Sequence, residues 1–221
     1  MGNSAKDSDS AEPAAEGLSK RMLKTRLSIT RTARALTAEL GYNGFTIEQL
    51  CEQVGISRRT FFNYFPGKLD AIFGHSSDDM PEGALERFIA ARPEGITGIS
   101  PTLLADTVAL VLEQLTFDEQ AIVCTHGMFK VAHREPELLQ RMMQMGPKKE
   151  QEFLDLLSQR EGVPADHPMF HFLAHAMRFC CMKAIDNYVA NAGAKSLADE
   201  FITVLTAAKE LFSQPLFLPH D

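Results

Sequence analysis

The chain has 221 residues, enough for one large or two small domains, and 45% of them are hydrophobic, which predicts a globular protein with a substantial core. Its net charge of −7 is unevenly spread: residues 18–75 hold nine Lys or Arg against four Asp or Glu, a net charge of +5. The remaining residues therefore carry −12 (−7 minus +5). A basic segment joined to an acidic body favours nucleic acid as a partner of the basic segment.

Secreted and integral-membrane classes are excluded by two further features. The four cysteines, at positions 51, 124, 180 and 181, show neither a CxxC motif nor the spacing of a disulfide framework. The sequence has no secretory signal and no apolar run of membrane-spanning length. We therefore expect a protein of the reducing cytoplasm with no membrane partner.

The N-terminal part is expected to hold a tail and a small domain. Residues 1–18 are rich in Ser, Ala, Asp, Glu and Pro, which predicts a disordered tail. A helix to about residue 40 follows, with Ile29, Ala33, Leu36 and Leu40 on its inner stripe. Its basic start either touches a phosphate or is an ordinary solvated face. We expect residues 19–67 to form one domain and residues 68–221 a second, helical one.

Two short helices joined by a tight turn are predicted next. Thr46 and Gln49 form a capping box for the first helix. Gly55 supplies the turn, and Ser57 caps the second helix, which ends before a proline. A helix, a glycine-containing turn and a second helix make the helix-turn-helix plan, whose second helix enters the major groove of DNA.

The second of these helices carries side chains suited to double-stranded DNA. Arg58 and Arg59 lie near its N-terminus, and Asn63 is a short polar group that can contact base edges. Phe61 and Phe65 lie four residues apart and are expected to pack inward. A solvated basic turn is the alternative. We expect the DNA contacts to come from Thr46, Ser57, Arg58, Arg59, Thr60, Asn63, Tyr64 and Lys68.

The segment from about residue 23 to residue 75 resembles the N-terminal DNA-binding domain of TetR-type transcriptional regulators. The resemblance rests on Thr46, Gly55, Ser57, Thr60, Phe61, Phe62, Tyr64, Phe65 and Lys68. That family often has a phosphate-binding Tyr where Phe62 stands, so we expect Phe62 to pack instead. The resemblance implies an all-α fold in which a C-terminal helical domain binds a ligand and dimerises.

Helices are predicted throughout the rest of the chain. Ser100 with Pro101, Asp118 and Ser196 are expected to cap three of them, and Pro147 is expected to interrupt another. The expected ranges are 67–76, 84–91, 101–115, 119–134, 136–146, 147–160, 168–192 and 196–213.

The helix expected at 168–192 is apolar on more than one face. Phe170, Leu173 and Met177 share one face, whereas Phe172 and Phe179 lie on another. A helix that is apolar nearly all round must be buried on two sides. This pattern predicts a homodimer built from the last two helices of each subunit; the alternative is a monomer with a large core.

The middle helices are rich in Met and Phe, residues that suit an adaptable apolar ligand site. The residues expected to contact a small, largely apolar effector are His126, Phe129, Met142, Phe153, His171, His175, Met177 and Arg178. Plain core packing is the alternative for each. His167, His171 and His175 recur every four residues, a spacing that can hold a metal, but no carboxylate completes a ligand set. We predict no metal and no cofactor.

The sequence predicts a transcriptional regulator that represses by binding a palindromic operator as a homodimer. Effector binding would favour a shape of the C-terminal domain that holds the two DNA-binding heads at the wrong spacing. No nucleophile elbow, phosphate loop, dinucleotide fingerprint or zinc-protease motif is present, which argues against an enzyme. A helical enzyme or a scaffold with an incidental basic head is the alternative.

Overall fold

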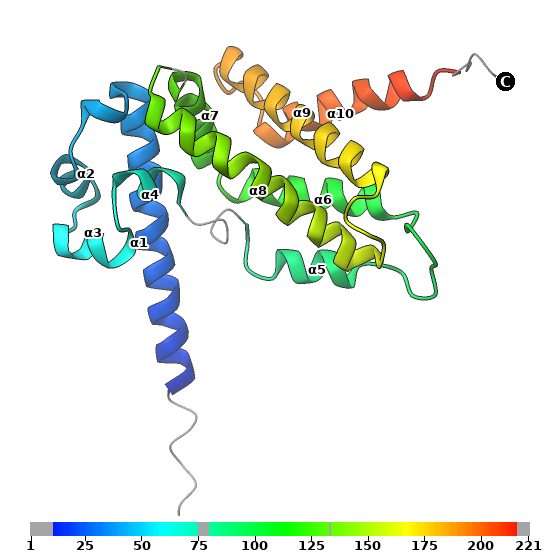
Figure 1. Ribbon diagram of the computed structural model, residues 1–221, viewed down its shortest axis with the longest axis horizontal. Helices are drawn as coiled ribbons and strands as arrows, with labels where there is room; N and C mark the ends of the chain where they lie inside the picture. The colour runs from blue at the N-terminus through cyan, green and yellow to red at the C-terminus, as the bar shows by residue number, and fades with distance from the viewer. Residues whose placement is uncertain (1–10, 75–79, 133, 216–221) are drawn as a thin grey trace, which may run out of the picture. The chain divides into compact units, whose positions relative to one another are not determined.

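The protein is all-α. The computed structural model describes residues 11–74, 80–132 and 134–215, with side chains from residue 21 onward, and these residues contain helices but no strand (Figure 1). None of the helices within these ranges is long and apolar enough to cross a membrane.

The chain divides into two compact units. Unit 1 comprises residues Met1–Asp78 together with Gly127–Leu138, and unit 2 comprises Asp79–His126 and Leu139–Asp221. Unit 1 thus includes a short segment from the middle of the chain. The division expected between residues 67 and 68 stays a prediction.

Unit 1 is built on one long helix. The helix α1 begins at Ala11, inside the stretch expected to be disordered, where Ala and Glu are strong helix formers; residues 1–10 lie outside the described part. Ile29 and Ala33 of α1 are fully buried and Leu36 is nearly so, as predicted. Leu40, also expected on the inner stripe, is 48% exposed, because it is the last residue of the helix. The helical elements of this unit before residue 75 are α1 (Ala11–Leu40), η1 (Tyr42–Gly44), α2 (Ile47–Val54), α3 (Arg58–Tyr64) and α4 (Lys68–Phe73).

A buried arginine ties α1 to α4. The Nε of Arg34 donates to the carbonyl of Ile72 at 2.8 Å, and its Nη2 donates to the carbonyl of Phe73 at 2.9 Å. These carbonyls end α4 and have no partner within the helix, so the guanidinium satisfies them and fixes the direction of α4.

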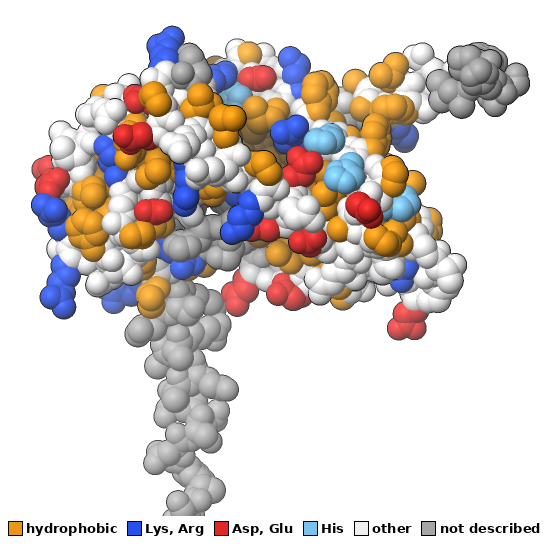
Figure 2. All heavy atoms as spheres, viewed as in Figure 1, with side chains coloured by type: hydrophobic (Ala, Val, Ile, Leu, Met, Phe, Trp, Pro, Cys, Tyr) orange, Lys and Arg blue, Asp and Glu red, His pale blue; other side chains and the backbone are white. Residues whose placement is uncertain are grey.

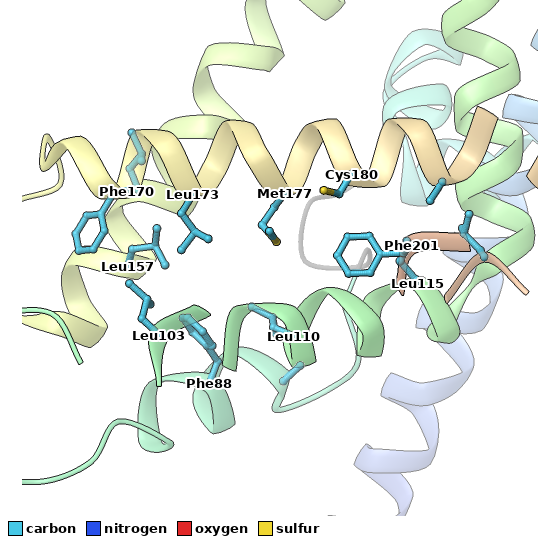
Figure 3. Close-up of a cluster of buried hydrophobic side chains, with 14 of the residues drawn as sticks. Phe88, Leu103, Leu110, Leu115, Leu157, Phe170, Leu173, Met177, Cys180 and Phe201 are labelled. Carbon is cyan, nitrogen blue, oxygen red and sulfur yellow. The ribbon is translucent and has the colours of Figure 1, made fainter. Parts of the chain in front are cut away.

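Unit 2 has its core between α9 and α6. Figure 3 shows Phe170, Leu173 and Met177 of α9 pointing towards Leu103 and Leu110 of α6. The other buried residues of this core come from α5, α8 and α10. The helices that contribute to unit 2 are α5 (Ala84–Ala90), α6 (Leu103–Phe117), α7 (Glu119–Ala132), α8 (Pro136–Glu161), α9 (Pro168–Ala190) and α10 (Leu197–Phe212).

Two expected helix features are wrong. Helix α8 continues through Pro147, because a single proline removes only one backbone hydrogen bond and the helix is long on both sides. Helix α6 begins at Leu103, and Ser100 does not cap it. The Ser100 amide and hydroxyl instead donate to the buried Glu161 carboxylate, at 2.7 and 3.1 Å.

By contrast, Asp118 and Ser196 cap α7 and α10 as predicted.

Candidate nucleic-acid interface

The predicted helix-turn-helix is present in unit 1, with the predicted caps. The Thr46 hydroxyl accepts from the amide of Gln49 at 3.3 Å, and the Thr46 amide donates to the Gln49 side chain at 2.8 Å. Gly55 ends α2 in the left-handed region at φ 76°, where a side chain would be strained, and its amide donates to the Cys51 carbonyl. These local bonds fix the angle at which the chain turns into α3.

The start of α3 is held by two hydroxyl groups. The Ser57 hydroxyl accepts from the amide of Thr60 at 3.0 Å, and the two hydroxyl oxygens lie 2.8 Å apart. Both groups are thus engaged with each other at the first turn. A capped N-terminus directs the remaining free amides and the positive end of the helix dipole towards any anion that approaches.

Two buried rings anchor α3 and set which side faces outward. Phe61 and Phe65 are essentially inaccessible, with their centroids 6.2 Å apart. The outward side chains, Arg58, Arg59, Phe62 and Asn63, are all exposed, and Thr60 and Tyr64 are half-buried. Figure 2 shows Lys and Arg side chains (blue) beside hydrophobic ones (orange) at the left edge, where Figure 1 places α3. We call Arg58, Arg59, Phe62 and Asn63 the outer face of α3.

Phe62 does not pack inward as expected. Its side chain is 47% exposed, because it lies on the outer face of α3 while Phe61 takes the inward position. It contacts the Phe61 ring edge-on at 5.3 Å, and the Arg58 guanidinium lies 5.9 Å from the centre of its ring. An aromatic ring therefore occupies the middle of the polar surface.

Lys68 was expected to contact a phosphate, but the structure gives it a place within unit 1. Its Nζ donates to the carbonyls of Tyr42 and Phe45 and lies 4.4 Å from the centre of each of their rings. Burial lowers the pKa of Lys68, although Glu137 and Glu135 act in the opposite direction. The ammonium thus holds the turn before α2, and this turn positions the helix-turn-helix.

Sequence analysis missed Glu135, which belongs to unit 1. Its carboxylate accepts from the amide of Tyr42 at 3.2 Å and from the side chain of Asn43 at 3.4 Å. Gly41 has φ 79°, a backbone conformation that favours glycine, and a Cβ there would lie 2.7 Å from Glu135 Oε1, so another residue would also require the Glu135 side chain to shift. Because more than ninety residues separate the partners, no local signal could have revealed this contact.

The eight residues expected to contact an effector lie in different environments. Met177 is buried in the core of unit 2 and Phe153 packs against that core, whereas Phe129 is exposed. His175 and Arg178 are also exposed: Arg178 Nη2 lies 3.4 Å from His175 Nδ1, and His175 Nε2 lies 3.5 Å from Glu150. Their position on the outer surface of α9 does not favour a part in an internal site. Two others, Met142 and His171, are half-buried.

The eighth of these residues, His126, is a buried group paired with a carboxylate. Its Nε2 lies 3.0 Å from the Asp186 carboxylate, and only 5% of the residue is exposed. Its Nδ1 is buried with no hydrogen-bond partner among the described residues. A buried nitrogen in that state costs about 1–3 kcal/mol, so a ligand that supplied a partner would gain from it.

Within the described part of the chain, no group of three His, Cys, Asp or Glu side chains is placed to hold a metal ion. His167 instead caps α9, because its Nδ1 accepts from the amide of Met169 at 3.2 Å. The regular spacing of His167, His171 and His175 therefore does not by itself indicate a ligand set.

Comparison with known proteins identifies the helical segment that carries this surface. Residues 29–72, from the middle of α1 to the end of α4, match the model of the bacterial regulatory proteins of the tetR family. This segment is a DNA-binding domain of the tetR type. Unit 1 of the chain therefore carries the DNA-binding domain of a transcriptional regulator.

A relative supports the same assignment over a longer stretch. The HTH-type transcriptional regulator TcmR of Streptomyces glaucescens is 29% identical over 160 residues, which cover 70% of this chain and 68% of that protein. The similarity therefore extends beyond the DNA-binding domain into the helices that follow it.

The position of Lys68 generates a prediction about stability. We expect Lys68→Met to lower the free energy of unfolding by about 1–3 kcal/mol, because two carbonyls lose their donor. Urea unfolding followed by circular dichroism measures this effect. Lys24→Met, at an exposed position of α1, removes the same charge and should change stability by less than about 0.5 kcal/mol. Equal effects of the two substitutions would contradict the structural role of Lys68.

Proposed function

We propose that this TetR-family protein is a repressor that binds a palindromic operator as a homodimer and releases it when a small effector binds. The observation that carries the proposal is the outer face of α3: two arginines and an asparagine are exposed on a helix whose caps and buried rings fix its orientation. Arginine and asparagine are the side chains that most often read guanine and adenine in the major groove.

The arginine at position 59 supplies the test of DNA binding. We expect Arg59→Ala to weaken operator binding about tenfold or more and to reduce the salt dependence by about one released ion, because an exposed cation near the phosphates is lost. Fluorescence anisotropy with duplex DNA flanking the gene, measured over a range of KCl concentrations, gives both quantities. Lys195→Ala, which makes the same charge change in unit 2, is the matched control; weakening by both to the same extent would count against the proposal.

The last two helices support the homodimer. Helices α9 and α10 pack against each other, yet both leave large apolar side chains exposed. A soluble chain rarely leaves so many such side chains on two neighbouring helices without a partner. The exposed residues are Met169, Phe172, Phe179, Met182 and Val189 of α9, and Ile202, Leu211 and Phe212 of α10. Two heads in such a dimer would contact half-sites about 34–36 Å apart.

A charge placed on this surface should separate the subunits. We expect Phe179→Glu to convert the dimer to a monomer, because two carboxylates would be buried without partners at a symmetric interface. Sedimentation velocity measures the mass. Leu104→Glu changes another exposed apolar residue, on α6, and should leave the dimer intact. A wild-type chain that sediments as a monomer at micromolar concentration would exclude this part of the proposal.

The effector response is supported by His126. Its buried, unpartnered Nδ1 favours a largely apolar molecule that carries one hydrogen-bonding group. In a thermal-shift panel of apolar compounds with a hydroxyl or amine, we expect a compound that raises the melting temperature of the wild type to weaken operator binding. His126→Phe should lose the shift. A compound that saturates the protein and leaves operator affinity unchanged would contradict control by an effector.

A further inference from the structure

The two arginines at the start of α3 differ in their surroundings. Arg58 forms an ion pair with Glu48 of α2 through Nη1, and its guanidinium lies over the Phe62 ring at 5.9 Å. Arg59 forms no ion pair within the part of the chain that the structure describes. One arginine is therefore held on two sides and the next one extends into solvent.

The partner of Arg58 is itself fixed. Glu48 lies in the first turn of α2, where the helix dipole favours a negative charge. Hydrogen bonds from its own amide and from the Thr46 hydroxyl, together with the Arg58 charge, lower the pKa of Glu48. The capping box that orients the helix-turn-helix thus also orients the carboxylate that holds Arg58.

The exposure of the three side chains indicates that this arrangement serves more than packing. The Arg58 side chain is 61% exposed, the Glu48 side chain is 54% exposed, and Phe62 is half exposed beside them. A surface ion pair of this kind contributes little to stability. It lies, however, on the edge of the surface that the proposed function places against DNA.

The geometry around Arg58 favours a contact with a base and disfavours a contact with a phosphate. A guanidinium has five donors, so an ion pair through Nη1 leaves donors free for the O6 and N7 atoms of a guanine. Fixing the guanidinium beforehand reduces the entropy lost on base recognition. A nearby carboxylate also repels phosphates and offsets the charge of Arg58, which weakens contacts that do not depend on sequence.

We propose that Glu48 and Phe62 are specificity-determining positioning residues, which hold Arg58 for readout of a guanine in the major groove and suppress its use as a phosphate contact. Arg59, which has no such partners, supplies the sequence-independent attraction. This inference rests on the proposed DNA-binding function and adds to it that the two adjacent arginines have different roles, one in base recognition and the other in phosphate attraction.

The experiment compares full-length variants on defined DNA. Wild-type protein first selects its preferred duplex from a randomised library. Dissociation constants are then measured for that duplex, for versions with each guanine replaced, and for an unrelated duplex, between 50 and 300 mM KCl (concentrations chosen to span about a Debye length of 14 to 5 Å). The specificity ratio is the affinity for the preferred duplex divided by that for the unrelated one.

We expect Glu48→Gln to bind the unrelated duplex more tightly, with a salt dependence steeper by about one ion, and to reduce the specificity ratio about tenfold. Arg58→Lys keeps the charge without the planar fork, so it should lose discrimination at the same guanine. The effects of the two substitutions on the ratio should not add, because both remove one interaction. Phe62→Leu should reduce the ratio in the same direction.

Glu52→Gln provides the matched control. Glu52 is exposed on α2 one turn after Glu48, so this variant has the same charge change without the contact to Arg58, and its specificity ratio should equal that of the wild type. Thermal melts by circular dichroism check that all variants fold. If Glu48→Gln behaves like Glu52→Gln, the positioning role is excluded while the proposed function stands. If the wild type selects no duplex from the library, the proposed function fails, and this inference fails with it.

Discussion

The contact on which the DNA-binding domain depends is that of the Lys68 ammonium with the carbonyls of Tyr42 and Phe45. This one group closes the turn before α2 from the first residue of α4 and lies against two aromatic rings. At the other end of α4, Arg34 holds the last carbonyls from α1. A cation thus acts at each end of the short helix α4: Lys68 at its start and Arg34 at its end. Together these contacts position the helix-turn-helix between α1 and α4.

The features that sequence analysis predicted well are those specified by neighbouring residues. The capping box at Thr46, the left-handed Gly55 and the Ser57 cap each involve only a few neighbouring residues, so they can be predicted from the sequence. The same holds for the caps at Asp118 and Ser196. Helix type and the outward face of α3 followed from these local rules.

The features that sequence analysis missed depend on partners far along the chain. Lys68 matched a motif position, but its bonds to a turn more than twenty residues earlier decide what it does. Ser100 looked like a cap, yet its hydrogen bonds go to Glu161. Phe62 was expected to pack because it lacks the hydroxyl of the family's Tyr, although only one of two adjacent rings can point inward from a short helix. Identity and spacing alone could not distinguish these outcomes.

The segment 127–138 limits how the two units can be separated. The boundaries between the two units fall inside α7, between residues 126 and 127, and inside α8, between residues 138 and 139. Glu135, whose carboxylate holds the turn before α2, lies in this segment. A fragment that ends before residue 127 therefore lacks part of unit 1, and no single cut in the chain releases both units whole.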